Sequence, residues 1–367
     1  MNLSIGIVGL PNVGKSTLFN ALLKREVALA ANYPFATIEP NVGIAAVPDE
    51  RLAVLAKVVG TEVIKPATIE FVDIAGLVKG ASEGAGLGNK FLSHIRETAA
   101  ICHVLRDFAD GEVVREGAVD PLSDLATIRT ELQLADLATL EKQKAPKGAV
   151  SETERKRWQV VSDFLQEIGQ GRSVLTLIEK QVQAENRELM EGIAKELNLL
   201  TAKKEIFVIN VAEEQLKNET TLKEKWASSL GVRAQTVVII SAKIEAELAQ
   251  LSDEDQALFL ADLGIKESGL GRLAKVAYDT LNLQSFLTAG ELEVRAWTIK
   301  KGSTAQAAAG AIHTDFVKKF IKANVAKVAD FIAAAGWKGL VSAGKMRTEG
   351  KDYVMQHDDI VEFMIGS

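Results

Sequence analysis

The sequence contains one cysteine, Cys102, among 367 residues. A single cysteine cannot form a disulfide within the chain, which suits a reducing compartment such as the cytosol. The chain also lacks any uncharged apolar run of about 18 residues, so we expect no membrane span. No basic leader precedes the apolar run at Leu3–Val8, and we therefore interpret that run as a first β-strand rather than a signal peptide.

The chain has no excess of basic residues either, since its formal net charge is −6. An acidic chain is not a general coat for nucleic acid, so any contact with nucleic acid must come from a local basic face. Apolar residues make up 47% and charged residues 25%, a balance that excludes a disordered chain. A length of 367 residues exceeds one hydrophobic core and predicts two or three domains.

The first part of the chain alternates between short β-branched runs and helical patterns. This alternation predicts an α/β domain with a mostly parallel sheet and helices on its faces. The expected strands are Leu3–Val8, Thr68–Val72 and Ile101–Phe108, and the expected helices are Thr17–Lys24 and Leu87–Ala99.

The pattern changes near Pro121. Residues 123–200 are charged and helix-forming without a strand signal, and further helices at about 151–170 and 174–199 would pair as an antiparallel hairpin. Strand patterns then return, and so we interpret the helical segment as an insertion in the α/β domain. The later expected elements are strands at Glu205–Asn210, Thr236–Ser241, Glu293–Ile299 and Ile360–Ile365 and a helix at Thr304–Ile312, with a third pattern starting near Leu283.

The segment Gly9-Leu-Pro-Asn-Val-Gly14-Lys15-Ser16 matches the phosphate-loop motif G-x-x-x-x-G-K-[ST] in full, between an expected strand and an expected helix. Its glycines let backbone N–H groups surround phosphates, and the helix N-terminus adds its dipole. We expect Lys15 to reach the β- and γ-phosphates and Ser16 to coordinate Mg²⁺. A chance glycine turn is the alternative, but the order of strand, loop and helix argues against it.

Three further segments fit a triphosphate site. Asp73 ends a strand, where its carboxylate can hold Mg²⁺, and Gly76 can offer its N–H to the γ-phosphate. Thr37 lies in a loop that could close its hydroxyl onto Mg²⁺. Gly80–Gly88 contains four glycines in nine residues and is typical of a switch loop, although a passive loop would look the same. Each pattern is weak alone and gains meaning from the phosphate loop.

Several blocks of sequence, in one order over nearly the whole chain, resemble the YchF or Obg-like ATPase family of P-loop NTPases. Only the helical segment between about 141 and 200 is loosely matched. The blocks that carry the resemblance lie at 9–22, 33–43, 73–81, 130–137, 210–213, 288–298, 311–316 and 349–353.

The resemblance implies a G domain at 1–125 and 203–282, an inserted helical coiled-coil arm at 126–202 and a C-terminal TGS domain of β-grasp-like fold at 283–367. It also implies a cytoplasmic ATPase that binds ribosomes, mainly the large subunit, through a basic face of the TGS domain and through the arm. We expect a monomer.

Base choice depends on the residues after the strand Glu205–Asn210. Guanine-specific domains carry N-K-x-D there, and its aspartate accepts from guanine N1–H and the 2-amino group. This chain has Asn210-Val-Ala-Glu213, without that lysine and aspartate. The resemblance implies that Asn210 and the backbone at Val211 contact adenine, with Phe108 beside the ring. Alternatively, Asn210 caps a helix.

The loop Ser241-Ala242-Lys243 is similar to the guanine-side loop of GTPases, so we expect ATP to bind better than GTP without excluding GTP. The predicted catalytic residues are Lys15, Thr37 and Gly76, and the predicted metal ligands are Ser16, Thr37 and Asp73. The residues predicted to contact the nucleotide are Asn12, Val13, Gly14, Lys15, Ser16, Thr17, Phe108, Asn210, Val211, Glu213, Ser241 and Ala242.

Hydrolysis is expected to be slow, because Leu77 stands where GTPases of this class carry a water-orienting glutamine. A K⁺ ion held by Asn12 is one replacement. The loop after Phe108, Asp110–Arg115, has no histidine, which family members often carry there. His103 falls within an expected strand, where we expect a core or surface histidine rather than a catalytic one.

The C-terminal part contains clustered lysines near aromatic residues, which fits a contact with ribosomal RNA phosphates. A solvated face is the alternative. Three hypotheses remain: an ATP-hydrolysing switch, a conventional GTPase of the same fold, and a ribosome- or protein-binding scaffold that barely hydrolyses its nucleotide. The basic residues are Lys318, Lys319, Lys322, Lys327, Lys338, Lys345, Arg347 and Lys351.

Overall fold

The computed structural model describes residues 3–30, 41–74, 86–108, 120–148 and 150–366. Two compact units divide the chain. The first comprises Met1–Leu22, Glu39–Gly43 and Glu70–Gly269, and the second comprises Leu23–Ile38, Ile44–Ile69 and Leu270–Ser367.

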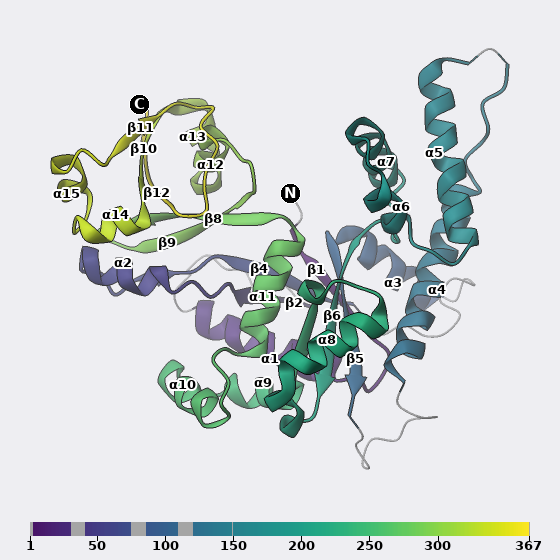
Figure 1. Cartoon of the computed structure of the whole chain (residues 1–367), viewed down its shortest axis with the longest axis horizontal. Coiled ribbons are helices and arrows are strands. Elements are labelled where there is room, and N and C mark those ends of the chain that lie inside the picture. The colour runs from purple at the N-terminus through teal and green to yellow at the C-terminus, as the bar shows by residue number, and fades with distance from the viewer. Residues whose placement is uncertain (1–2, 31–40, 75–85, 109–119, 149, 367) are drawn as a thin grey trace. The chain divides into compact units, whose positions relative to one another are not determined.

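The first unit is built on a six-stranded sheet in the order β2-β4-β1-β5-β6-β7 (Figure 1). The phosphate-loop motif directly follows β1, one of its inner strands. β1 pairs in parallel with β4 and β5, and β5–β6 and β6–β7 are also parallel. β2 runs antiparallel to β4, because the Asp73 N–H donates to the Asn41 carbonyl and the Val47 N–H donates to the Ala67 carbonyl. The strands are β1 (Ile5–Val8), β2 (Val42–Ala46), β4 (Thr68–Asp73), β5 (Ala100–Asp107), β6 (Lys204–Val211) and β7 (Val237–Ile240).

One face of this sheet is covered by four helices. Ile101 and Leu105 lie four residues apart on β5 and so point to the same face. Ile101 packs with residues of α3 and α4, and Leu105 packs with residues of α8 and α9. The helices of this part are α1 (Lys15–Ala30), α3 (Gly86–Glu97), α4 (Pro121–Leu140), α8 (Glu219–Leu230), α9 (Ala242–Leu248) and α10 (Asp253–Asp262), with the 3₁₀ turns η2 (Glu213–Asn218) and η3 (Ala234–Thr236).

The helical segment after α4 forms an apolar cluster of its own. α5 (Glu152–Gly169) begins with a capping box, in which the Ser151 hydroxyl and the Glu154 carboxylate each accept from the other residue's backbone N–H. α5 buries Val161 and Phe164 against α6 (Val174–Lys180) and α7 (Ala184–Glu196). At the base of the segment, the buried Asp136 carboxylate accepts from the backbone N–H groups of Leu200 and Thr201 at 2.8 and 2.7 Å. These two hydrogen bonds join α4 to the turn that precedes β6.

The predicted single helix at 174–199 is wrong, because the chain breaks at residues 181–183 into α6 and α7. No proline or glycine marks the break. In a continuous helix, the buried Ile178 and Met190 would lie roughly 120° apart around the axis at about 100° per residue. The extended link brings both into one apolar cluster and leaves Val182 94% exposed.

The second unit contains a mixed six-stranded sheet in the order β11-β10-β12-β8-β9-β3. α12 covers one face, burying Ala305 and Ala308 against Phe286 and Val325. β3 comes from the first quarter of the chain, outside the segment 283–367. The elements are β3 (Ile64–Lys65), β8 (Leu283–Ala289), β9 (Val294–Lys300), β10 (Phe320–Lys327), β11 (Arg347–Glu349), β12 (Asp359–Ile365), α2 (Arg51–Val59), α11 (Gly269–Thr280), α12 (Ala305–Ile312), α13 (Thr314–Lys319), α14 (Val328–Ala333) and α15 (Trp337–Ser342).

The α/β architecture with its mostly parallel sheet and inserted helices is confirmed. The three-part division and the TGS assignment of 283–367 stay predictions. Within the described ranges, no helix combines the length and the apolar character that crossing a bilayer requires.

Candidate nucleotide-binding site

The phosphate-loop motif links the end of β1 to the start of α1, as the sequence predicted. α1 begins at Lys15, so the backbone N–H groups of its first turn have no intrahelical acceptor and can receive an anion. Asn12 and Gly14 adopt left-handed backbone angles, with φ of 65° and 91°. Gly14 has a second constraint, since a Cβ there would lie 2.1 Å from Nδ2 of Asn210. The loop is thus folded tightly against β6.

Lys15 and Asp73 form an ion pair at the ends of two neighbouring strands. Asp73 ends β4 and is the register partner of Ile7 on β1, directly before the loop. Both side chains are largely buried, at 11% and 22% exposure. The structure therefore brings these two predicted site residues into direct contact, with the Asp73 carboxylate bound to the Lys15 ammonium group next to the phosphate loop.

Asn210 joins the phosphate loop to the loop after β7. Its Nδ2 donates to the Val13 carbonyl at 2.9 Å, and its Oδ1 accepts from the Ala242 N–H at 2.9 Å. The side chain is buried, with the residue 3% exposed. An asparagine amide has two N–H donors and two acceptor lone pairs, so one of each remains for another partner. Ala242 is the first residue of α9, so Asn210 does satisfy a helix N-terminus, as the alternative predicted, but that of a distant helix rather than of the helix that follows its own strand.

Sequence reasoning missed one residue of this site, Arg106. Its Nη1 donates to the Asn12 carbonyl at 3.3 Å, its Nε donates to the Phe108 carbonyl at 3.1 Å, and its guanidinium carbon lies 4.5 Å from the Phe108 ring centroid. The signal in the sequence was an arginine directly after the mainly apolar run Ala100–Leu105 and still within the expected buried strand, where a charged residue needs a specific partner.

The other predicted nucleotide contacts lie in different surroundings. Val211, Ser241 and Ala242 are buried around Asn210, whereas Glu213 is exposed at the start of η2. Ser16 and Thr17 are exposed on the first turn of α1. Several predicted features lie outside the described residues: Thr37, Gly76, Leu77, residues 80–85 of the expected switch loop and the loop Asp110–Arg115.

His103 is a core histidine, one of the two roles, core or surface, that its strand position suggested. It is fully buried and stacks on the Phe207 ring at 5.4 Å between centroids. Its Nε2 lies 2.8 Å from a carboxylate oxygen of Glu205, and Arg129 donates to the other oxygen at 2.7 Å. Burial raises the pKa of Glu205, but the hydrogen bond and charge of His103, together with Arg129, lower that pKa to about 2.

The predicted metal ligands that the structure describes, Ser16 and Asp73, are hard oxygen donors, which suit Mg²⁺. No three histidine, cysteine or acidic side chains converge in the described part of the chain. A magnesium ion here would therefore share its coordination with phosphate oxygens and water rather than sit in a cage of protein ligands.

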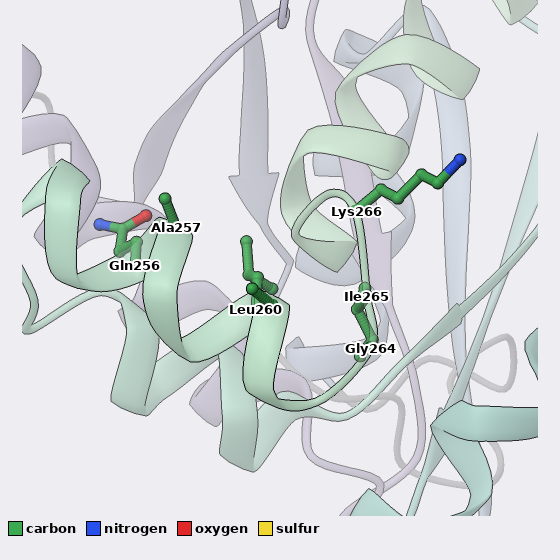
Figure 2. A pocket seen from close by; sticks show the side chains of 7 residues that line it. Gln256, Ala257, Leu260, Gly264, Ile265 and Lys266 are labelled. Atoms are coloured by element: carbon green, nitrogen blue, oxygen red, sulfur yellow. The ribbon is translucent and has the colours of Figure 1, made fainter.

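A separate hollow of about 520 Å³ lies beside α10 (Figure 2). Its walls come from α10 and the following turn, including Leu260, Ile265 and Lys266. None of the predicted nucleotide contacts lines it. The hollow is therefore separate from the phosphate-loop site.

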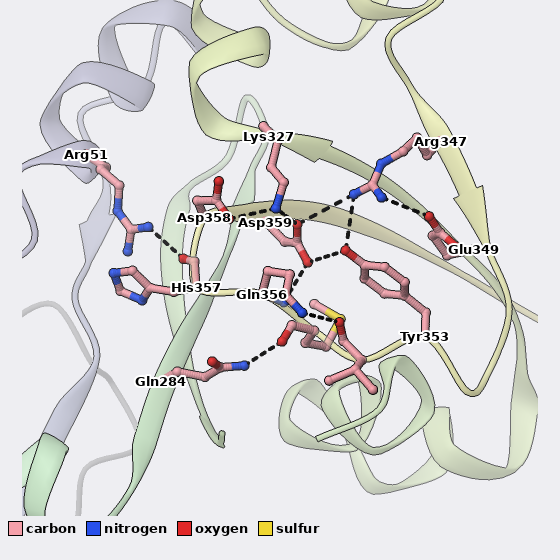
Figure 3. Close-up of polar contacts among 12 residues, drawn as sticks. Arg51, Gln284, Lys327, Arg347, Glu349, Tyr353, Gln356, His357, Asp358 and Asp359 are labelled. Atoms are coloured by element: carbon pink, nitrogen blue, oxygen red, sulfur yellow. Dashed lines mark hydrogen bonds and ion pairs between the residues drawn. The ribbon is translucent and has the colours of Figure 1, made fainter. Parts of the chain in front are cut away.

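The predicted basic face is smaller than the sequence suggested. Lys327 binds Asp358 and the buried Asp359 at 2.7 and 3.1 Å, and Arg347 binds Glu349 at 3.1 Å (Figure 3). Lys345 pairs with Asp330 at 2.6 Å. These three cations thus stabilise the second unit internally. Among the eight residues of the predicted basic face, those that are exposed and form no ion pair with another described residue are Lys318, Lys319, Lys322, Lys338 and Lys351.

The strand–loop–helix geometry, the Lys15–Asp73 pair and the sheet order define a P-loop nucleotide-binding domain of the GTPase type. Comparisons with known proteins agree. Residues 4–134 match a family described as "50S ribosome-binding GTPase", and residues 283–366 match the YchF GTPase C-terminal family, described as "Protein of unknown function".

Full-length relatives identify the family more closely. The chain is 48% identical to the "Ribosome-binding ATPase YchF" of Haemophilus influenzae and 45% identical to that of Bacillus subtilis, each over 99% of both chains. The solved structure of the YchF GTPase of Schizosaccharomyces pombe superposes with a TM-score of 0.84 at 37% identity, covering 99% of this chain and 98% of that one. The chain belongs to the YchF family.

Proposed function

We propose that this protein is an Mg²⁺-dependent ATPase that associates with ribosomes and acts as a nucleotide-controlled switch. It binds ATP in preference to GTP and hydrolyses it slowly. The observation that carries the proposal is the joint placement of Lys15, Asp73 and Asn210 around one phosphate loop. The names of the bacterial relatives, ribosome-binding ATPases, support the nucleotide and the partner.

Lys15 is the group that compensates the phosphate charge. In the structure, the Lys15 ammonium group forms an ion pair with the Asp73 carboxylate. A triphosphate offers stronger, charge-assisted acceptors to the same ammonium group, and its arrival frees the Asp73 carboxylate. Mg²⁺ held near Ser16 and Asp73 would neutralise charge on the β- and γ-phosphates. The protein's own contribution is orientation, from the N–H groups of the loop and the first turn of α1.

The preference for ATP follows from what the base end lacks. Guanine recognition uses an aspartate at the fourth position of the motif, and this chain carries the longer Glu213 there, exposed at the start of η2. Asn210 already uses one donor and one acceptor within the protein. A buried site without the matching acceptor gains nothing from the guanine 2-amino group.

A conventional GTPase is the second candidate, because both the matched family description and the solved relative carry the word GTPase. Identification of the nucleotide bound to the purified protein, followed by calorimetric affinities for ATP and GTP, separates the two. Slow hydrolysis is tested by single-turnover assays with and without K⁺. No turnover under either condition would favour a scaffold that binds nucleotide without hydrolysing it.

Ribosome association is tested by co-sedimentation with purified ribosomes and separated subunits in the presence of ATP, ADP or no nucleotide. We expect the large subunit to retain the protein, in keeping with the matched family description. The exposed cations Lys318, Lys319 and Lys322 and the helical segment are the proposed contacts, so binding should weaken as salt rises.

A further inference from the structure

Two neighbouring strands hold two consecutive carbonyls of the phosphate loop. Arg106 on β5 and Asn210 on β6 are register partners. Arg106 binds the carbonyl of Asn12, and Asn210 binds the carbonyl of Val13. The loop is therefore fixed from the sheet side at two adjacent peptide groups, by an arginine on one strand and an asparagine on the next.

Holding these carbonyls determines where the next N–H groups point. In a trans peptide the C=O and the following N–H point in opposite directions, and no cis peptide occurs among the described residues. Fixing the Asn12 carbonyl toward Arg106 aims the Val13 N–H away from the sheet, toward the phosphate side of the loop. Asn12 has a left-handed φ of 65°, which asparagine adopts more readily than most residues with a side chain, and the bond from Arg106 to its carbonyl fixes this conformation.

The same guanidinium also holds Phe108. Its Nε donates to the Phe108 carbonyl, and its plane lies over the Phe108 ring. Arg106 is 2% exposed, and no carboxylate among the described residues forms an ion pair with it. A buried cation next to a loop that receives a polyanion attracts that anion strongly, because little water screens the charge.

We propose that Arg106 is a positioning residue of the nucleotide site, which aims the phosphate loop through the Asn12 carbonyl and holds Phe108 for the base. This inference rests on the proposed nucleotide binding. Arg106 thus supplies a cation to the loop in a chain whose Asn210–Glu213 segment lacks the lysine of the guanine motif. It couples the two ends of the site through one rigid, planar group.

The test compares Arg106→Met, Arg106→Lys and a control, Arg129→Met. Arg129 is also an arginine of the same unit, with its guanidinium carbon 5.5 Å from the Phe207 ring, but it pairs with Glu205 away from the loop. Calorimetry with ATP and ADP should show affinity about 10- to 100-fold weaker in Arg106→Met, since hydrogen bonds from a charged donor are lost. Arg106→Lys keeps the charge without the fork and should recover part of the loss. Arg129→Met should lower the melting temperature and leave affinity unchanged.

A second measurement separates positioning from folding. Phe108→Ala should weaken ATP binding but leave inorganic tripolyphosphate binding unchanged, whereas Arg106→Met should weaken both. If Arg106 holds Phe108, the double variant loses less ATP affinity than the product of the two single losses. Arg106→Met or Arg106→Lys with unchanged affinity, measured well below the melting temperature, would overturn this inference alone. A wild-type protein that binds no nucleotide would overturn the proposed function and this inference with it.

Discussion

Gly14 and Asn210 are in backbone-to-side-chain contact, so close that a Cβ on Gly14 would lie 2.1 Å from the Asn210 amide nitrogen. That nitrogen donates to the carbonyl of Val13, the residue before Gly14. The glycine of the phosphate loop is thus needed for two reasons at once: its φ of 91° and the space that Asn210 fills. The segments that we propose for the base and for the phosphates meet at this contact.

We therefore expect Gly14→Ala to weaken ATP binding by at least about tenfold, because either the loop or Asn210 must move. Gly231→Ala is the matched control: Gly231 also has a positive φ, of 66°, but nothing lies within 4 Å of its added Cβ. That control should cost about 1–2 kcal/mol of stability and leave affinity intact. Calorimetry together with thermal unfolding checks both variants. Gly14→Ala with normal affinity would mean that the contact does not shape the site.

Lys15→Ala should abolish tight triphosphate binding while the fold stays intact. The lysine pairs with a largely buried Asp73 but supports no apolar cluster, so its removal should lower the free energy of unfolding by about 1–3 kcal/mol, the cost of leaving a buried carboxylate without its partner. Titration with a fluorescent ATP analogue measures the affinity, and a thermal melt of the nucleotide-free protein measures stability. Affinity close to that of the wild type would remove Lys15 from the proposed phosphate site.

Ser16→Ala and Thr37→Ala should differ in their dependence on the γ-phosphate. Ser16 is fixed on the first turn of α1, so its loss should weaken Mg²⁺-dependent binding of both ADP and ATP. Thr37 is proposed to reach the metal only with a triphosphate, so its loss should spare ADP. Mg²⁺ titrations with ADP and with a non-hydrolysable ATP analogue make the comparison. If Thr37→Ala matched the wild type with the triphosphate analogue, Thr37 would not be a switch residue.

The free energy of unfolding at acidic pH should depend on Glu205. Its pKa in the fold, about 2, lies below the reference value of 4.5. Because the folded pKa is depressed, the ionised group stabilises the fold fully above pH 4.5, and this stabilisation disappears as the pH falls toward 2. Glu205→Gln should lower stability by about 1–3 kcal/mol at pH 7 and reduce the loss on acidification.

Urea unfolding midpoints between pH 2 and pH 7 measure that difference. Glu141→Gln serves as the control, because Glu141 is exposed just after α4. Other carboxylates also titrate in this range, so the informative quantity is the difference between each variant and the wild type. Equal pH profiles for Glu205→Gln and the wild type would show that the His103–Glu205–Arg129 cluster does not contribute to acid sensitivity.

Local patterns predicted what local physics determines. The strand, glycine loop and helix around Lys15 follow from short-range preferences and were found in order, and the βα alternation gave the sheet. The break at 181–183 could not be predicted, because it contains no glycine or proline. It arises because apolar residues before and after it would face different sides of one continuous helix.

Some residues of the site could likewise be predicted from the sequence, and others could not. Lys15 and Asp73 could be paired from their motif positions, because parallel strands end at one edge of the sheet. The roles of Arg106 and Asn210 required the register between β5 and β6, which no sequence spacing specifies. Lys327 and Arg347 counted toward a basic face until the structure showed them bound to Asp359 and its neighbours.

The base preference provides the sharpest test of the proposed function. Asn210-Val-Ala-Glu213 lacks the aspartate that accepts from guanine, and buried polar groups reject a base that leaves them unpaired. We expect ATP to bind more tightly than GTP by about 1–3 kcal/mol, the free energy of one or two hydrogen bonds. Calorimetry with both nucleotides measures this difference in the unmodified protein. GTP binding at least as tight as ATP binding would replace the ATPase hypothesis with that of a conventional GTPase.

Glu213→Asp then tests the origin of the preference. It places an aspartate at the fourth position of the motif, and Glu213 is exposed, so the change should not disturb folding. A lysine at Val211 is less suitable, because Val211 is 2% exposed and packs in the apolar cluster with Trp226. We expect Glu213→Asp to move the ratio of affinities toward GTP without reversing it, since the Ala242 N–H and the Asn210 side chain still shape the pocket. Glu214→Asp, the neighbouring exposed carboxylate, is the matched control and should leave the ratio unchanged. Both substitutions keep the negative charge and shorten the side chain by one methylene, so an equal shift in both variants would indicate a general effect of shortening this acidic segment, and the motif explanation of base choice would be wrong.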